Sequence, residues 1–330
     1  MVAPLLKTKK TQALLTFMLV LFLNLTNAQT TFFNADFENG TGVNAWTSTS
    51  TGGNASNWIR DVDNTTGIGH NRPAVPLFFA GTGNTTSCMY TQRHGVVAQY
   101  QNNTNIQATS PVIDFSGYEN ITLSIDTRTD SENNIDGMRL EYRLNGGGWQ
   151  NLGNGAGWYD GNVGSLGSNG WSGGTANSVW QTRSINISTQ DINFNGNEEV
   201  EFRVVFASNG NNRDVGVAFD NFRLSGFAAP EIVVTGNAVN IVDGDATPAL
   251  ADFTVFGATT IGTPITRTFQ IRNTGLLPLT IGAFTFGGAN ASEFTLVTPP
   301  AATLAIGATT TFTVSFSPGA LGVRNATISF

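Results

Sequence analysis

The sequence predicts an all-β protein made of two successive β-sandwiches. Segments in which apolar and polar residues alternate recur along most of the chain, and Gly, Asn and Pro residues separate them. This is the pattern of half-buried strands joined by turns. The length of 330 residues, less an N-terminal export segment, is enough for two domains. Aromatic usage divides the chain, because all six tryptophans and all five tyrosines precede residue 181.

Residues 1–28 are predicted to be a signal peptide. A basic stretch at 7–10 precedes an apolar run over 14–25, and the small residue Ala28 follows, an order typical of export signals. An uncleaved membrane anchor is the alternative, but the run is shorter than the roughly 20 residues that a spanning helix needs. We therefore expect a secreted or outer-cell-surface protein with no transmembrane anchor in its mature part.

The charge and the cysteine content limit the classes of partner and of site. The three lysines of the chain all lie in the export segment, so its cleavage would lower the formal net charge from −7 to −10. A chain this acidic has no basic field for a phosphate backbone, which argues against nucleic acid as a partner. Cys88 is the only cysteine, so we expect neither an internal disulfide nor a thiolate metal site.

The region 231–330 is predicted to be an immunoglobulin-like β-sandwich. About seven strand-like segments fall within about 100 residues, the number expected for that fold, and no helical pattern competes with them. In TTTFTVSFSP the alternation places Phe312, Val314 and Phe316 on one face. Residues 227–230 are predicted to be the linker that joins this domain to the preceding one.

Four segments of this region carry a family resemblance, in the order EIVVTGNAVNIVDGDATP, TRTFQIRNTGLLPLTI, GANASEFTL and TTTFTVSFSPGALGVRNATISF. Together they resemble the choice-of-anchor D repeat, an immunoglobulin-like module related to Hydin-type domains and common in exported Bacteroidetes proteins. The resemblance implies a module of a large cell-surface protein. Because the chain stops at Phe330 inside an alternating segment, we expect this domain to be truncated and the chain to be a fragment of a longer polypeptide.

The region 29–226 is predicted to be a jelly-roll-like β-sandwich with longer loops than the second region. Strand-like alternation occurs, for example, in NITLSIDTRTD, GMRLEYRLNGGGWQNL and EVEFRVVFASN. The segments ADFENG, MRLEYRLNGGGWQNLG and VGVAFDNFRLSG resemble the MAM-like and carbohydrate-binding jelly rolls of bacterial surface proteins and secreted hydrolases. This resemblance implies a recognition module whose partners are extracellular glycans or surface proteins.

The long segment 153–177 is predicted to form the recognition surface of this jelly roll, because long loops of a sandwich lie at its rim, where binding sites usually form. Aromatic rings can stack on sugar faces while polar groups bind the hydroxyls. The candidate carbohydrate-binding residues are Trp158, Tyr159, Trp171, Asn154 and Asp160. The alternative is that the three aromatic side chains pack beneath the loop. Trp149 and Trp180, in strand-like segments, are expected to lie in the core.

Calcium, as a structural ion, is the one cofactor that the sequence suggests. Carboxylate and carbonyl oxygens are the ligands that Ca²⁺ prefers, and the opening and closing strands of such jelly rolls commonly pair. The candidate ligands are Asp36 and Glu38 on the opening strand and Asp220 and Asn221 on the closing strand. Ordinary rim charges are the alternative. A second acidic group, Asp243, Asp245 and Asp252, also offers carboxylates to calcium. Turn formation by Asp-Gly explains the first two of these residues equally well.

The sequence shows no catalytic constellation. Cys88 with His70 or His94 could in principle support nucleophilic chemistry, but no family signature accompanies them. Zinc motifs such as HExxH and CxxC do not occur. We therefore predict a non-enzymatic secreted or cell-surface protein with adhesion or recognition and spacer modules. One alternative is a pair of accessory modules of a secreted hydrolase whose catalytic domain lies beyond residue 330, and another is a spacer without a ligand.

Overall fold

The fold is all-β, as the sequence predicts. The computed structural model describes residues 28–37, 46–51, 58–60, 88–91, 99–153, 157–174, 179–187 and 199–330. Every regular element in these ranges is a strand, apart from the short 3-10 turns η1 (Gly164–Leu166) and η3 (Ala291–Glu293). The predicted signal peptide falls almost wholly outside these ranges. Within them, no helix is long and apolar enough to cross a bilayer.

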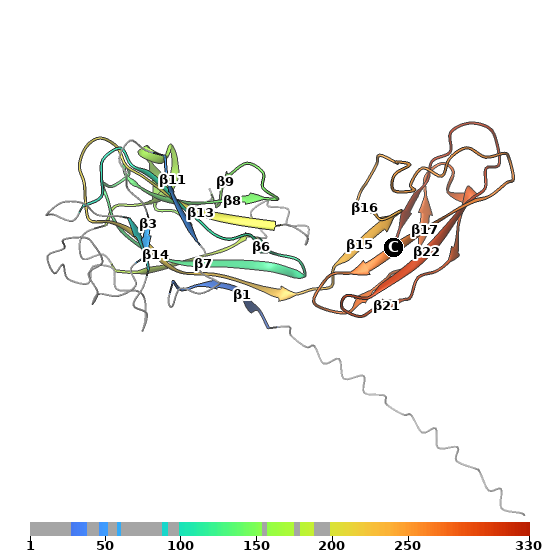
Figure 1. Cartoon of the computed structure of the whole chain (residues 1–330), viewed down its shortest axis with the longest axis horizontal. Helices are drawn as coiled ribbons and strands as arrows, with labels where there is room; N and C mark the ends of the chain where they lie inside the picture. Colours follow the sequence, from blue (N-terminus) through green and yellow to red (C-terminus); the bar gives the residue numbers. More distant parts are fainter. Residues whose placement is uncertain are drawn as a thin grey trace, which may run out of the picture.

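Two sheets form the first sandwich (Figure 1). The strands of one sheet are β1 (Thr30–Ala35), β3 (Trp58–Arg60), β4 (Met89–Thr91), β7 (Tyr118–Asp130), β12 (Gln181–Asn186) and β14 (Gly216–Ala228). They lie in the order β12-β7-β14-β4-β3, and β1 also pairs with β14. The strands of the other sheet are β2 (Thr47–Ser50), β5 (Asn105–Thr109), β6 (Ile113–Asp114), β8 (Gly137–Leu144), β9 (Gln150–Asn151), β10 (Gly161–Val163), β11 (Ser168–Ser172) and β13 (Glu199–Ala207). Their order is β10-β11-β8-β13-β5-β2, with β6 on β13 and β9 on β8.

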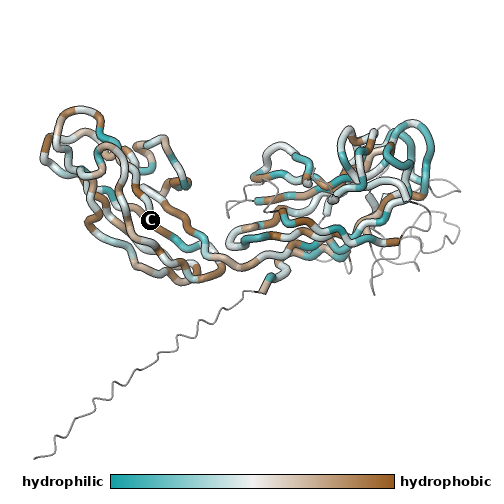
Figure 2. The backbone as a smooth tube through the Cα atoms, turned by 180° about the vertical axis from the view of Figure 1, so that it is seen from behind, coloured by the Kyte–Doolittle hydropathy of each residue, from teal (hydrophilic) through white to brown (hydrophobic). Residues whose placement is uncertain are grey.

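Strand alternation builds the core of the first sandwich. Met138 and Leu140 of β8 and Phe202, Val204 and Phe206 of β13 are fully buried, whereas the residues between them include the charged ones of both strands. Burying a side chain of this size stabilises the fold by roughly 1.5–3 kcal/mol. Apolar residues, brown in Figure 2, occur along the chain in both sandwiches.

The second sandwich contains the strands β15 to β23. Their bounds are β15 (Ile232–Gly236), β16 (Val239–Ile241), β17 (Ile265–Asn273), β18 (Leu279–Thr280), β19 (Thr285–Gly287), β20 (Phe294–Thr298), β21 (Thr303–Leu304), β22 (Thr309–Phe316) and β23 (Thr327–Ser329). One sheet has the order β16-β15-β17-β22-β20, and β18-β21 and β19-β23 form separate pairs. On β22, Phe312, Val314 and Phe316 are only 2%, 4% and 8% exposed, which confirms that these three side chains share the buried face.

A hydrogen-bonded junction joins the two sandwiches, and it differs from the predicted linker. Phe227 and Ala228 belong to β14, where they pair with Glu119 and Tyr118 of β7. After them, the Ala229 N–H donates to the Gly117 carbonyl (2.8 Å) and the Leu276 N–H donates to the Ala229 carbonyl (2.9 Å). The sequence suggested a break here because Ala228, Ala229 and Pro230 are small or turn-forming. Strand pairing nevertheless continues almost to Pro230.

Two glycines allow the backbones to approach closely at this junction. A Cβ on Gly275 would lie 2.3 Å from the Glu231 nitrogen and 2.5 Å from the Ala229 oxygen, and a Cβ on Gly117 would lie 2.9 Å from the Leu276 nitrogen. Among the described strands, no sheet joins β1–β14 with β15–β23. We therefore retain, as a proposal, a division of the chain into the regions 29–226 and 231–330, which meet at a close-packed contact.

The substitution Gly275→Ala should loosen this junction. The added methyl group meets backbone atoms rather than a movable side chain, so the contact must open, and we expect a loss of about 1–3 kcal/mol in the free energy of unfolding. Urea denaturation measures the loss, and small-angle scattering measures the change in overall dimensions. Gly148→Ala is the matched control, because a Cβ there meets nothing within 4 Å. Equal stability and dimensions for the two variants would contradict a close-packed junction.

Candidate functional site

The aromatic residues predicted to bind sugar lie in the core of the first sandwich. Trp158, Tyr159 and Trp171 are only 4%, 9% and 0% exposed, and the centroids of neighbouring rings lie 4.9–6.0 Å apart. The Trp171 indole N–H donates to the Trp158 carbonyl (2.7 Å). Burial raises the pKa of Tyr159 to about 12, and its hydroxyl donates to the carbonyl of Leu140 (3.0 Å). The burial of these three rings agrees with the alternative that they pack beneath the loop and leaves them little exposed surface for a sugar.

Trp149 and Trp180 were expected to lie in the core. Both are half-buried, and neither belongs to the main core of the first sandwich. The Trp149 ring lies beside the guanidinium groups of Arg143 (4.7 Å) and Arg203 (4.3 Å), on the face of β8 and β13 that carries charged residues. Trp180 packs against a small cluster that contains Cys88. Asn154, also predicted to bind sugar, lies outside the described residues, as do His70 and His94.

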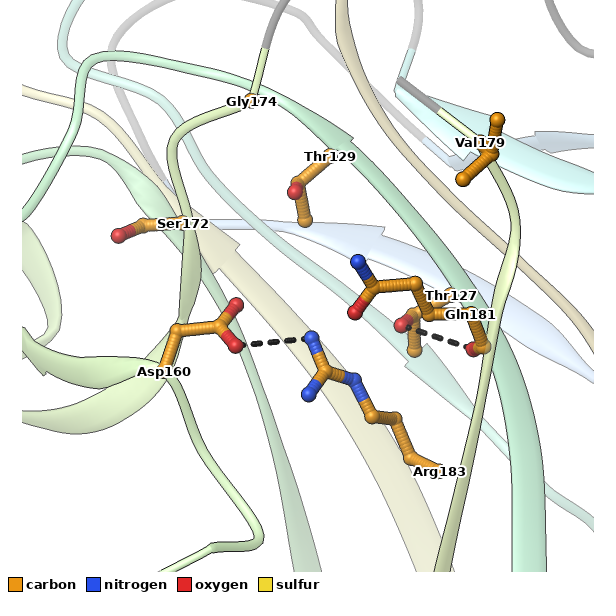
Figure 3. A pocket seen from close by; sticks show the side chains of 8 residues that line it. All are labelled: Thr127, Thr129, Asp160, Ser172, Gly174, Val179, Gln181 and Arg183. Carbon is orange, nitrogen blue, oxygen red and sulfur yellow. Dashed lines mark hydrogen bonds and ion pairs between the residues drawn. The ribbon is translucent and has the colours of Figure 1, made fainter.

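A pocket of about 190 Å³ opens at one edge of the first sandwich (Figure 3). It contains the predicted residue Asp160. The polar side chains on its walls are Thr127 and Thr129 of β7, Gln181 and Arg183 of β12, Ser172 of β11, and Asp160. In Figure 3 the side chains of Asp160 and Arg183 point toward each other, and Val179 is the one aliphatic side chain drawn.

Strand register explains why polar side chains project between the sheets here. On β12, Gln181 lies opposite Thr127 and Arg183 lies opposite Ile125. Directly opposite residues of an antiparallel pair share a face, and Ile125 is fully buried, so Gln181 and Arg183 lie on the core-facing side of the sheet. Since β12 is an edge strand of its sheet and β10 of the other, the row of apolar side chains ends here and polar side chains take its place.

Asp160 and Arg183 form the charged part of the pocket. Arg183 Nη2 lies 2.8 Å from Asp160 Oδ1, and the two side chains are 20% and 36% exposed, respectively. An ion pair this exposed contributes little to stability. The Arg183 Nε–H is buried and has no hydrogen-bond partner among the described residues. The Thr127 hydroxyl donates to the Gln181 carbonyl (3.3 Å). The pocket thus offers a carboxylate, a guanidinium group, an amide and hydroxyl groups.

Of the charged and amide residues that line the pocket, Asp160 was expected from the sequence, whereas Gln181 and Arg183 were not. Their signal is present in the segment VWQTRSINIS, where Gln181 and Arg183 occupy the same alternating row as Ile185 and Ile187. Ile187 is fully buried and Ile185 packs against the core. Polar residues that continue an inward-facing row indicate either a strand that leaves the core or a site that uses them.

The candidate calcium ligands are brought together only in part. Strands β1 and β14 pair as predicted, with Ala35 opposite Phe222, so Asp36 follows β1 at the level of Asn221. Asp220 is fully buried, and its carboxylate accepts a hydrogen bond from the Asn221 N–H (2.7 Å). Glu38 lies outside the described residues.

The donor chemistry at this place suits a hard cation, but the described residues do not complete a site. Asn221, whose backbone has a φ of 47°, donates a hydrogen bond from its side-chain Nδ2 to the Asp126 carboxylate (2.9 Å). No group of three or more His, Cys, Asp or Glu side chains within the described ranges is arranged to hold a metal ion. Calcium at Asp36, Glu38, Asp220 and Asn221 therefore stays a prediction.

Two carboxylates of the second acidic group form turns. The Asp245 carboxylate accepts hydrogen bonds from the Thr247 N–H (2.8 Å) and hydroxyl (2.7 Å). Asp252 does the same with the Thr254 N–H (2.9 Å) and hydroxyl (2.5 Å). These contacts agree with the alternative explanation from turn formation.

A separate acidic cluster lies at one end of the first sandwich. Asp136 is fully buried and accepts hydrogen bonds from the Tyr100 hydroxyl (2.8 Å), the Ser165 hydroxyl (3.0 Å) and the Asn209 N–H (2.8 Å). Burial raises the pKa of Asp136, and also the pKa values of Asp130 and Asp214, with additional repulsion from neighbouring carboxylates. The hydrogen bonds of Asp136 connect four segments of the chain, although burying a charged carboxylate is itself unfavourable.

Comparison with known proteins identifies the second region. Residues 250–330 match the family described as the HYDIN/CFA65/VesB-like, Ig-like domain, which confirms the Hydin-type immunoglobulin-like resemblance. No curated protein matches the chain.

Solved structures to which the chain shows a distant likeness include adhesin and carbohydrate-binding modules. The K1 cleaved adhesin domain of Lys-gingipain from Porphyromonas gingivalis W83 is 14% identical, with a TM-score of 0.34 over 59% of this chain and 97% of that chain. The family 11 carbohydrate-binding module of the cellulase Lic26A-Cel5E of Clostridium thermocellum is 13% identical, with a TM-score of 0.31 over 60% and 95%. The Endo-D glycoside hydrolase domain of Streptococcus pneumoniae R6 is 11% identical, with a TM-score of 0.30 over 70% and 35%. These likenesses carry no conclusion about function.

Calcium should raise the thermal stability of the first sandwich if the predicted site binds it. Any ligand that binds only the folded state stabilises it by about 2.7 kcal/mol at a hundredfold excess over Kd, so the melting midpoint should rise in millimolar CaCl₂ and fall with chelator. Asp36→Asn should abolish the shift, whereas Asp245→Asn, in a turn of the other sandwich, should keep it. A midpoint that is the same in calcium and in chelator would remove the site from consideration.

The acidic cluster should make the first sandwich more stable at mildly acidic pH. Because folding raises the pKa of Asp130, Asp136 and Asp214, the folded state takes up protons first, and its stability falls as pH rises through these raised values. The free energy of unfolding should therefore increase as pH is lowered from 7 toward 4. Asp214→Asn should flatten this dependence, and Asp243→Asn, at an exposed turn, should not. Urea denaturation at several pH values measures the free energy of unfolding. A free energy that decreases steadily on acidification would contradict the prediction.

Proposed function

We propose that this protein is a non-catalytic, secreted or cell-surface recognition protein, whose first sandwich binds a glycan at the edge pocket and whose second sandwich is an immunoglobulin-like spacer. The observation that carries the proposal is the pocket itself. It lies at the rim segment expected to hold the recognition surface, and it contains Asp160 with Arg183 and Gln181. The same binding activity would serve as an accessory module of a secreted hydrolase, which is the alternative reading.

The chemistry of the pocket supports a polyhydroxylated ligand. Hydroxyl, amide, carboxylate and guanidinium groups line it, and each can exchange hydrogen bonds with a sugar hydroxyl. Its volume of about 190 Å³ lies below the roughly 300–1,000 Å³ of drug-sized sites, so it suits a single sugar unit.

The junction supports a spacer role for the second sandwich. A close contact at Gly117 and Gly275, with backbone hydrogen bonds through Ala229, holds the two sandwiches at a defined separation (Figure 1). A spacer of this kind presents the binding module at a distance from its point of attachment. A long flexible tether would instead reduce the effective concentration of the binding module at its target.

Screening the full chain on a glycan array tests the binding function. We expect retention of glycans that bear an accessible sugar unit, and Arg183→Gln should weaken binding about 10- to 100-fold, because a hydrogen bond from a charged group contributes about 1.5–3 kcal/mol. Arg143→Gln is the control. Arg143 does not line the pocket, and its Nε lies 2.6 Å from the Glu201 carboxylate, with which it forms an ion pair. A blank array, or an equal loss in both variants, would contradict the proposal.

A further inference from the structure

We propose that the edge pocket selects neutral sugars over anionic ones, because Asp160 compensates Arg183, the one cation among the described residues that line the pocket. This inference rests on the glycan-binding function proposed above and specifies its ligand class. The charged side chains that line the pocket are Asp160 and Arg183, and they are paired at 2.8 Å. The other polar lining groups are hydroxyls and an amide, so the described residues of the lining carry a formal charge of zero.

An anionic sugar finds no uncompensated cation in this pocket. To reach Arg183, the carboxylate of a uronic or sialic acid would have to lie beside the Asp160 carboxylate or displace it from the guanidinium. Both routes bring two negative charges together, and like charges at short range disfavour binding. The formal net charge of the whole chain is −7, which adds a weaker long-range repulsion that salt will screen.

A neutral sugar with two adjacent hydroxyls matches the same pair of groups. One hydroxyl can donate to the Asp160 carboxylate, whose side chain is 36% exposed, while its neighbour accepts from the guanidinium of Arg183, whose side chain is 20% exposed. The carboxylate and the guanidinium lie side by side, as the two hydroxyls of such a sugar do. Charge-assisted hydrogen bonds of this kind are stronger than those between neutral groups, so the ion pair becomes an acceptor and donor set for a diol.

Asp160→Asn is the variant that separates charge from shape. It keeps the size of the side chain and one oxygen acceptor but leaves the charge of Arg183 uncompensated, so the pocket becomes cationic. We expect the unmodified chain to bind neutral oligosaccharides at least 10-fold more tightly than uronate- or sialate-terminated ones of matched length. In Asp160→Asn, binding of the neutral set should weaken and binding of the acidic set should strengthen, so that the preference narrows about 10-fold or reverses.

Asp114→Asn is the control for net charge. Asp114 is exposed, and its carboxylate accepts hydrogen bonds from the Ser116 N–H and hydroxyl, so its substitution changes the charge of the chain equally but outside the pocket. Binding of both oligosaccharide sets to the full chain is measured by calorimetry at low and at physiological salt, with thermal melting to verify folding.

The outcomes distinguish this inference from the function on which it rests. A narrowed preference in Asp160→Asn but not in Asp114→Asn supports the inference. Binding of acidic oligosaccharides through Arg183 by the unmodified chain, or equal shifts in the two variants, overturns it while leaving glycan binding intact. Absence of binding to either set overturns both.

Discussion

The pairing of strand β14 with three other strands is the interaction on which the rest of the molecule depends. Strand β14 pairs with β1, β4 and β7. It therefore connects the beginning of the described chain with the middle of the first sheet. Its residues from Gly216 to Phe222 are all buried, which makes this segment costly to displace. Because β14 continues directly into Ala229 and the junction, the same strand also fixes where the second sandwich begins.

The edge pocket forms at β12, the edge strand of the sheet, which is separated from the central strand β14 by β7. Near β14, both sheets supply apolar side chains and the space between them is filled. At β12 the sheet ends, and the row that contains Ile185 and Ile187 is continued by Arg183 and Gln181. A sandwich cannot close such an edge by strand pairing, so side chains and loops must cover it. Here the turn that carries Asp160 reaches across and pairs with Arg183, leaving a polar space between the sheets.

Much of the fold could be predicted because alternation is a local property of the sequence. The shared face of Phe312, Val314 and Phe316 follows from this alternation, whereas the pairing of β1 with β14 was expected from the jelly-roll fold and not from the alternation. The fate of aromatic side chains could not be predicted in this way. Trp171 lies on β11 opposite Met138 of β8, and only that long-range pairing turns it into the core. Trp149, in a strand-like segment, instead lies over two arginines. Composition identifies such residues as important, but the register decides which face they occupy.

Buried polar groups in the first sandwich fall into two physically different kinds. Asp136 is completely buried, yet it accepts three hydrogen bonds from groups in separate segments, so its burial is compensated by internal contacts that hold an end of the sandwich together. Arg183 is different, because its ion pair with Asp160 is partly exposed at the edge pocket and contributes little to stability. A buried group whose hydrogen bonds are all internal is explained by folding. A charged pair that lines a pocket without stabilising the fold can exchange hydrogen bonds with a ligand, and this contrast favours the edge pocket over the acidic cluster as the place where the protein meets its ligand.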